Sequence, residues 1–129
     1  MFSMKCLAVL PLATTCFLAM SPIANASEWY LAATNNSDDK FFLDRSSIVK
    51  TGGKAKTNLF AVFQKADKGV IGFTGEIEFD CETKKLRYLK YADLGEDGST
   101  KQFGADKDWT PIKPGSVNDV VLKEVCSGR

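Results

Sequence analysis

The clearest pattern in the chain is an alternation of apolar and polar side chains between residues 70 and 81. The apolar positions of this segment are Ile71, Phe73, Ile77, Phe79 and Cys81. Because successive side chains of a β-strand point to opposite faces, the period of two predicts a strand with one buried and one solvated face. Residues 54–64 repeat the pattern, and their predicted buried positions are Ala55, Thr57, Leu59, Ala61 and Phe63.

Turn-forming residues separate these two strands from each other and from their neighbours. Residues 65–69 are a predicted five-residue loop that carries a glycine, and residues 51–53 are a predicted hairpin break. The other predicted strands are residues 28–34, 40–44 and 84–91, with a candidate short strand at 101–103 and an extended segment at 109–114.

Matching the apolar faces predicts how the strands pair, since a slip of one residue would expose every apolar side chain. The predicted antiparallel partners across the first pair are Phe63 with Ile71, Ala61 with Phe73, Thr57 with Ile77, and Ala55 with Phe79. Across the second pair they are Phe79 with Leu86 and Ile77 with Tyr88. The outer face then carries cross-strand pairs of opposite charge, namely Lys54–Asp80, Lys56–Glu78, Glu78–Arg87 and Asp80–Lys85.

Near the C-terminus the apolar period changes from two to that of a helix. Val117, Val121 and Val125 are spaced to share one helical face, and Ser116 is a suitable N-cap. The sequence therefore predicts a helix over residues 117–126. The fold class is α+β, an antiparallel sheet of five to six strands with one C-terminal helix packed on one face and one disulfide.

The first 26 residues have the pattern of a secretory signal peptide. A lysine is followed by a mostly apolar run of about 15 residues and by Ala24-Asn25-Ala26, which predicts cleavage between Ala26 and Ser27. A membrane anchor is the first alternative, but it needs about 20 apolar residues. A lipoprotein with a lipidated Cys16 is the second. The predicted domains are therefore a signal peptide, 1–26, and one folded domain, 27–129, without a transmembrane helix.

Two cysteines, Cys81 and Cys126, follow the predicted cleavage site. In an exported chain a single pair of cysteines typically forms a disulfide, and this one would close a loop of 46 residues. A metal or redox pair is the alternative. No Cys-x-x-Cys spacing and no histidine accompanies it.

Composition excludes several functional classes. With 17 Lys and Arg against 16 Asp and Glu, the chain lacks the excess of positive charge typical of nucleic-acid binding. Because there is no histidine, Ser-His and Cys-His nucleophiles are excluded. No cofactor and no metal site is predicted. Three carboxylates, Glu76, Glu78 and Asp80, share one strand face and leave a carboxylate-based hydrolase as a hypothesis, although the charge pairing above explains them more simply.

Two candidate binding surfaces remain. The first is a basic strand, in which apolar and aromatic residues alternate with Lys84, Lys85, Arg87 and Lys90. It could hold an acidic partner, and a solvated strand face is the alternative. The second is the pair Leu89 and Tyr91, which the predicted register places together on the outer face. Large apolar side chains there indicate an interaction patch or a dimer contact.

Several short motifs, in this order and spacing, resemble the surface-adhesin protein E family of small exported bacterial proteins. They are Trp29, the segment FFLDRSSI at 41–48, FDC at 79–81 before the basic strand, WTPIKPGS at 109–116, and Val125-Cys126. The resemblance covers nearly all of residues 28–126. It implies an antiparallel sheet with one helix and a Cys–Cys bridge.

By resemblance, the function is adhesion, meaning non-catalytic binding of host matrix or serum proteins at the bacterial surface. The family's basic segment then corresponds to Lys84, Lys85, Arg87 and Lys90. A periplasmic structural or interaction domain without a host ligand is the alternative. The expected location is outside the cytoplasm, in the periplasm or on the outer surface of a Gram-negative bacterium.

Overall fold

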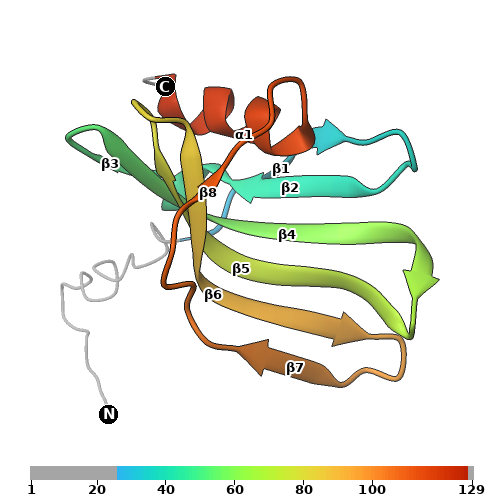
Figure 1. Cartoon of the computed structure of the whole chain (residues 1–129). Helices are drawn as coiled ribbons and strands as arrows, with labels where there is room; N and C mark the ends of the chain where they lie inside the picture. Colours follow the sequence, from blue (N-terminus) through green and yellow to red (C-terminus); the bar gives the residue numbers. More distant parts are fainter. Residues whose placement is uncertain (1–25, 128–129) are drawn as a thin grey trace, which may run out of the picture.

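One antiparallel sheet and one helix make up the part of the chain that the computed structural model describes, residues 26–127 (Figure 1). The strands are β1 (Trp29–Thr34), β2 (Lys40–Asp44), β3 (Val49–Thr51), β4 (Lys54–Asp67), β5 (Val70–Asp80), β6 (Lys85–Gly95), β7 (Thr100–Phe103) and β8 (Thr110–Pro111). The helix is α1 (Val117–Cys126), and a 3₁₀ turn, Arg45–Ser47, follows β2. The predicted signal peptide lies outside the described residues, apart from Ala26.

Six strands form the continuous sheet in the order β1-β2-β4-β5-β6-β7. Two short strands extend it, since β3 pairs with β4 and β8 pairs with β6. The predicted fold class is confirmed, and the helix has the predicted bounds. Ser116 caps it, because the Ser116 hydroxyl accepts the N–H of Asp119 at 3.2 Å.

The register through the centre of the sheet is the predicted one. Thr57 lies opposite Ile77, and Phe79 lies between Ala55 on β4 and Leu86 on β6. The predicted charged pairs are also cross-strand neighbours. In this central part of the sheet, the hydrophobic period therefore predicts correctly which side chains of β4 and β5 face the core.

The hairpin between β4 and β5 differs from the prediction. The register shifts near the end of β4, so the predicted pairing of Phe63 with Ile71 is wrong, and Ile71 is 41% exposed. β4 continues to Asp67, and only Lys68 and Gly69 form the turn, with φ of 52° and 83°. Two positive φ values define a type I′ turn, whose twist matches that of the flanking strands in a two-residue hairpin. The observed connection is therefore shorter than the predicted five-residue loop.

The core lies between one face of the sheet and α1. The helix contributes Val121, Leu122 and Val125, all buried, and these meet the buried sheet residues Leu43, Ala55, Leu59, Ala61, Ile77, Phe79 and Leu86. In Figure 1 the helix crosses one end of the sheet, beside β1 and β2, and the part of the sheet nearer β7 extends away from it. Aromatic side chains pack on that second part, including Phe73, Tyr88 and Tyr91.

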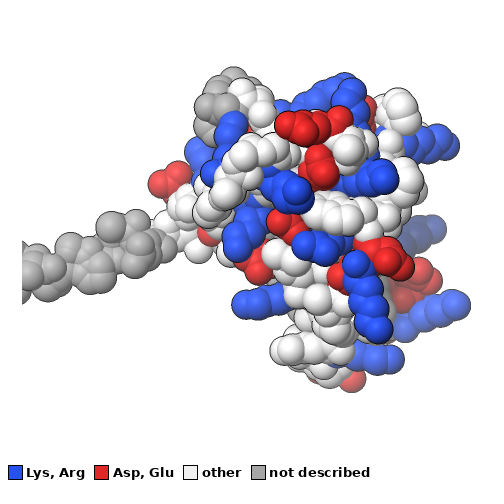
Figure 2. Space-filling view, turned by 60° about the vertical axis from the view of Figure 1, so that its left-hand side comes forward, with Lys and Arg blue, Asp and Glu red and all other residues white. Residues whose placement is uncertain are grey.

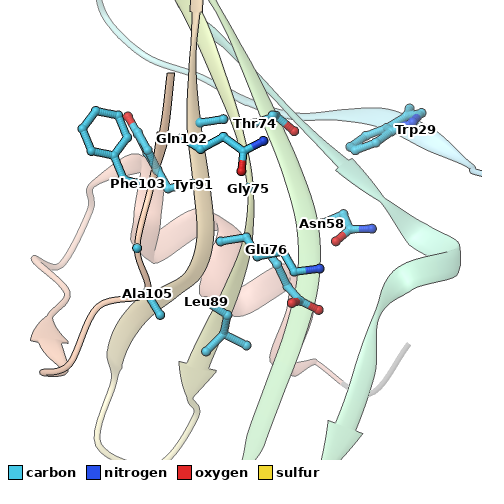
Figure 3. Close-up of a pocket in the computed structure, with 13 residues that line it drawn as sticks. Trp29, Asn58, Thr74, Gly75, Glu76, Leu89, Tyr91, Gln102, Phe103 and Ala105 are labelled. Atoms are coloured by element: carbon cyan, nitrogen blue, oxygen red, sulfur yellow. The ribbon is translucent and has the colours of Figure 1, made fainter. Parts of the chain in front are cut away.

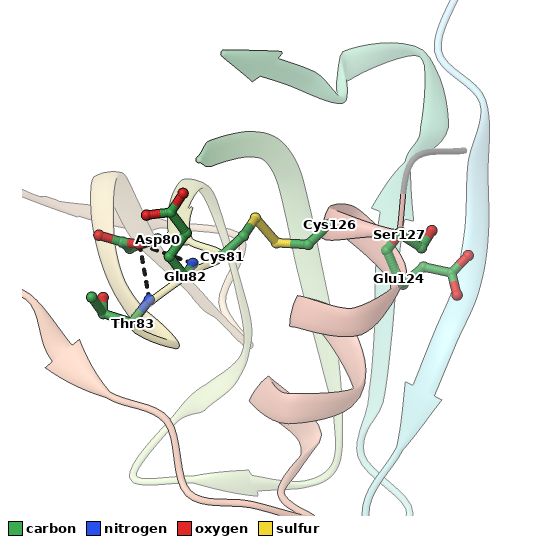
Figure 4. Close-up of a disulfide and its surroundings, with 7 residues drawn as sticks. All are labelled: Asp80, Cys81, Glu82, Thr83, Glu124, Cys126 and Ser127. Atoms are coloured by element: carbon green, nitrogen blue, oxygen red, sulfur yellow. Dashed lines mark hydrogen bonds between the residues drawn. A yellow bond between two sulfur atoms is a disulfide. The ribbon is translucent and has the colours of Figure 1, made fainter. Parts of the chain in front are cut away.

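A disulfide joins the end of β5 to the end of α1. Cys81 and Cys126 are bonded, with their Cα atoms 5.9 Å apart (Figure 4). The bridge confirms the predicted pairing over the metal and redox alternatives. The bridge holds the last turn of the helix against the end of β5, a central strand, and so helps to keep Val125 in the core.

Removing the disulfide should lower the free energy of unfolding by about 4 kcal/mol, because an unfolded chain with a closed loop of this length loses that much conformational freedom. Urea unfolding of a double variant, Cys81→Ala with Cys126→Ala, should show this loss relative to the oxidised protein. Wild-type protein unfolded with a thiol reductant should behave like the double variant. An unchanged unfolding midpoint in both would contradict the assigned role of the bridge.

Candidate functional site

A β-bulge in β6 decides which of its side chains face each side of the sheet. Ile77 lies opposite Tyr88, but the next residue back on β5, Glu76, lies opposite Lys90, so Leu89 is an extra residue. After such a bulge the alternation is reversed. Tyr91 therefore lies on the core face, where its ring stacks on Phe73 with centroids 5.0 Å apart.

The bulge corrects the sequence-based placement of Leu89 and Tyr91 on one outer patch. Leu89 stays on the outer side, next to Lys90, and Tyr91 turns to the opposite face. Burial, with a smaller contribution from Asp93, raises the pKa of Tyr91 to about 12. The sequence of β6 carries no signal for this bulge, because the residue that makes room for it lies on the neighbouring strand β5.

That residue is Gly75, which lies opposite Tyr91. A Cβ atom at Gly75 would lie 2.4 Å from the backbone oxygen of Lys90, much closer than a non-bonded contact permits. The missing side chain therefore lets β6 approach β5 where the extra residue bends it.

The predicted basic strand does not form one free cationic surface. Arg87 bonds Glu78, with Nε 3.0 Å from Oε1, and its guanidinium lies 4.4 Å from the ring centroid of Trp109. Lys85 lies opposite Asp80. Lys84 is a turn residue with φ of 58°. On the face shown in Figure 2 acidic side chains are interspersed among the basic ones.

The carboxylate at the end of β5 serves the turn that follows it. Asp80 accepts the backbone N–H groups of Glu82 and Thr83, both at 3.1 Å (Figure 4). The Thr83 hydrogen bond is the largest cause that holds the pKa of Asp80 below its ordinary value, against the opposing effect of burial. A hydrolase needs the opposite shift in its general acid, so Asp80 does not support that hypothesis.

A groove of about 510 Å³ lies on the face of the sheet opposite α1 (Figure 3). Asn58, Glu76 and Lys90 lie side by side in register across β4, β5 and β6 and form its polar row. Gln102 of β7 lines the groove at the far edge of the sheet. Trp29 of β1 lines it on the other side.

The polar side chains of the groove have no protein partners. Within residues 26–127, those of Asn58, Glu76, Lys90 and Gln102 make no hydrogen bond or ion pair with another residue. Their backbones are held in the sheet, and the N–H of Asn58 also donates to the Ser47 hydroxyl at 2.8 Å. The groove therefore presents side-chain donors and acceptors that extend from a fixed backbone and are open to a ligand.

Aromatic side chains border the groove on the outer face. Trp29 is 42% exposed, and its ring meets Phe60 edge to face with centroids 4.9 Å apart. Phe60 in turn stacks on Phe42 at 4.7 Å. Leu31 and Val62 are exposed large apolar residues on the same side. An exposed apolar patch beside unpaired polar groups is typical of a binding surface.

The structure brings some of the predicted site residues together and not others. Leu89 and Lys90 line the groove, and Tyr91 borders it although its ring stacks on Phe73 on the core face. Lys85 and Arg87 lie beyond the groove along β6, and Lys84 lies in the turn before β6. Sequence reasoning missed Trp29, Asn58 and Gln102 as site residues. The predicted register does imply that Asn58 faces Glu76, but β1 and β7 lie at opposite edges of the sheet, and no pattern in the sequence indicates that both line the same groove.

Neither a metal site nor a spanning helix emerges from the described residues. Between residues 26 and 127, no three Cys, Asp or Glu side chains are grouped so that they could hold a metal ion. In the same part of the chain, the helix is too short and too polar to cross a bilayer.

Comparison with known proteins gives one match. A protein-family model described as surface-adhesin protein E matches residues 29–127. No curated protein and no solved structure matches the chain significantly. The family match starts at the tryptophan of the groove and ends just after the second cysteine of the disulfide.

Substituting Gly75 should destabilise the protein by about 1–3 kcal/mol, because a methyl group there forces β5 and β6 apart at the bulge. Urea unfolding of Gly75→Ala should reveal this loss. Gly104→Ala is the matched control, since no atom lies within 4 Å of the added carbon, and it should stay within about 0.5 kcal/mol of the wild type. Equal effects of the two substitutions would disprove the close approach.

Proposed function

The chain belongs to the surface-adhesin protein E family, and we propose that it is an exported, non-catalytic binding module that attaches to a host matrix or serum protein through the outer face of its sheet. The observation that carries this proposal is the groove described above, where four polar side chains without partners lie beside an aromatic cluster whose outermost member, Trp29, is exposed. Exposed aromatic residues are the commonest anchors of protein interfaces.

Export is supported by two features of the chain. Residues 1–26 have the pattern of a signal peptide, so the proposed mature protein begins at Ser27. The Cys81–Cys126 disulfide needs an oxidising compartment, which the cytoplasm does not provide. The proposed location is the outer surface of a Gram-negative cell.

The charge distribution supports contact through shape and hydrogen bonding more than through electrostatic attraction. Of the four basic residues that the family resemblance singled out, Lys90 alone lines the groove, and it lies opposite Glu76. Arg87 is already paired with Glu78. We therefore propose that salt changes the affinity for the host partner only weakly.

A charge placed on the outer face should weaken host binding, because it must lose water when the partner covers it. Two exposed valines provide a matched pair, since Val62 on β4 and Val120 on α1 are each 45% exposed. Val62→Lys should lower the affinity for immobilised matrix or serum proteins at least tenfold, and Val120→Lys should leave it unchanged. Surface plasmon resonance with the exported, purified protein measures both.

Antibody labelling of intact cells provides the second readout of this experiment. Labelling before lysis supports a surface position. Labelling only after lysis would contradict the adhesin proposal and favour a periplasmic interaction domain. An equal loss of binding in the two valine variants would show that the outer face is not the contact surface.

A further inference from the structure

The side chains of the groove point to one class of ligand. We infer that the groove binds an uncharged sugar unit, carried by a glycan of the host protein. This inference rests on the proposed function and names the chemical group that the same site recognises. Three observations support it, namely the mixture of hydrogen-bonding groups, the aromatic wall and the balance of charge.

Hydrogen-bonding capacity is the first observation. Asn58 and Gln102 each offer an amide that both donates and accepts, Glu76 accepts, and Lys90 donates. Sugar hydroxyl groups also donate and accept, so each can pair with two of these side chains at once. Because none of the four has a partner within residues 26–127, a ligand gains these bonds without breaking contacts inside the protein.

The aromatic wall is the second observation. Trp29 lines the groove with its ring braced by Phe60 at 4.9 Å and an interplanar angle of 73°. One face of a pyranose ring carries C–H groups of slight positive character, which favours contact with the electron-rich face of an indole. Figure 3 shows Trp29 to one side of the polar row, with Asn58 and Glu76 nearer the centre of the groove. A sugar in the groove can therefore meet both an apolar and a polar surface.

Charge and shape favour this ligand over a peptide or an ion. Glu76 and Lys90 lie opposite each other and cancel, so the groove has no net charge with which to select an anion or a cation. Its floor is formed by β4, β5 and β6, whose backbone groups are already paired with neighbouring strands. A peptide therefore cannot add to the sheet there as an extra strand. The volume of about 510 Å³ lies within the range of small-ligand sites.

The direct test uses nuclear magnetic resonance of the full exported protein with lactose, maltose and chitobiose as probes. The indole N–H of Trp29 and the side-chain amides of Asn58 and Gln102 give separate signals. At least one disaccharide at millimolar concentration should shift these signals, while the indole signal of Trp109, outside the groove, stays fixed. No shift with any of the three would overturn the inference.

Variants at Trp29 separate stacking from simple loss of apolar surface. Trp29→Leu should weaken disaccharide binding at least tenfold, because it removes the aromatic face. Trp29→Phe should retain most of it, and Trp109→Leu should have no effect. Equal binding by the Leu and Phe variants would contradict the stacking contact.

A second arm distinguishes this inference from the proposed function. A host glycoprotein that binds the wild type should bind at least tenfold more weakly after its glycans are removed enzymatically. Unchanged binding after deglycosylation would overturn the sugar inference, and the protein surface would then be the ligand, as the proposed function alone requires. If no host protein binds in either form, the proposed function fails, and the disaccharide titration still decides the chemistry of the groove.

Discussion

The pairing of β5 with β4 on one side and β6 on the other is the constraint on which the rest of the structure depends. It assigns Phe73, Ile77 and Phe79 to the core face and the intervening carboxylates to the open face. A shift of one residue would exchange the two faces completely. Helix α1 and the disulfide then cover one end of the apolar face, and the groove lies on the opposite, outer face of the sheet.

Much of this arrangement could be predicted from the sequence because it follows from periodicity. The alternation over residues 70–81 predicts the register with β4 and with the first part of β6. The change of period at Val117 predicts the helix with its observed bounds, and two cysteines in an exported chain predict their bridge. The failures occur where the period is interrupted. Ile71 fits the alternation, yet it is exposed because the strands shift at the type I′ hairpin.

The candidate site was less predictable because it depends on contacts between distant strands. The bulge at Leu89 reverses the side on which Tyr91 lies, and its visible cause is a glycine on β5 that no local pattern connects with β6. Lys84, Lys85 and Arg87 stood out in the sequence by their charge, but the fold uses Arg87 to bind Glu78 and Trp109. Trp29 and Gln102 gave no signal as site residues, since they belong to β1 and β7 at opposite edges of the sheet and only the folded sheet brings both to the groove.

The bulge in β6 places Tyr91 on the core face and Lys90 in the groove, so one observation tests both. Nuclear Overhauser effects between side chains test the bulge most directly. The ring protons of Tyr91 should show strong cross-peaks to those of Phe73, whose centroid lies 5.0 Å away, and Leu89 should show none to Phe73. The opposite result, with no cross-peaks between Tyr91 and Phe73 and with Tyr91 beside Leu89 on the outer face, would mean that β6 runs without a bulge. Lys90 would then leave the polar row, and the groove described here would not exist.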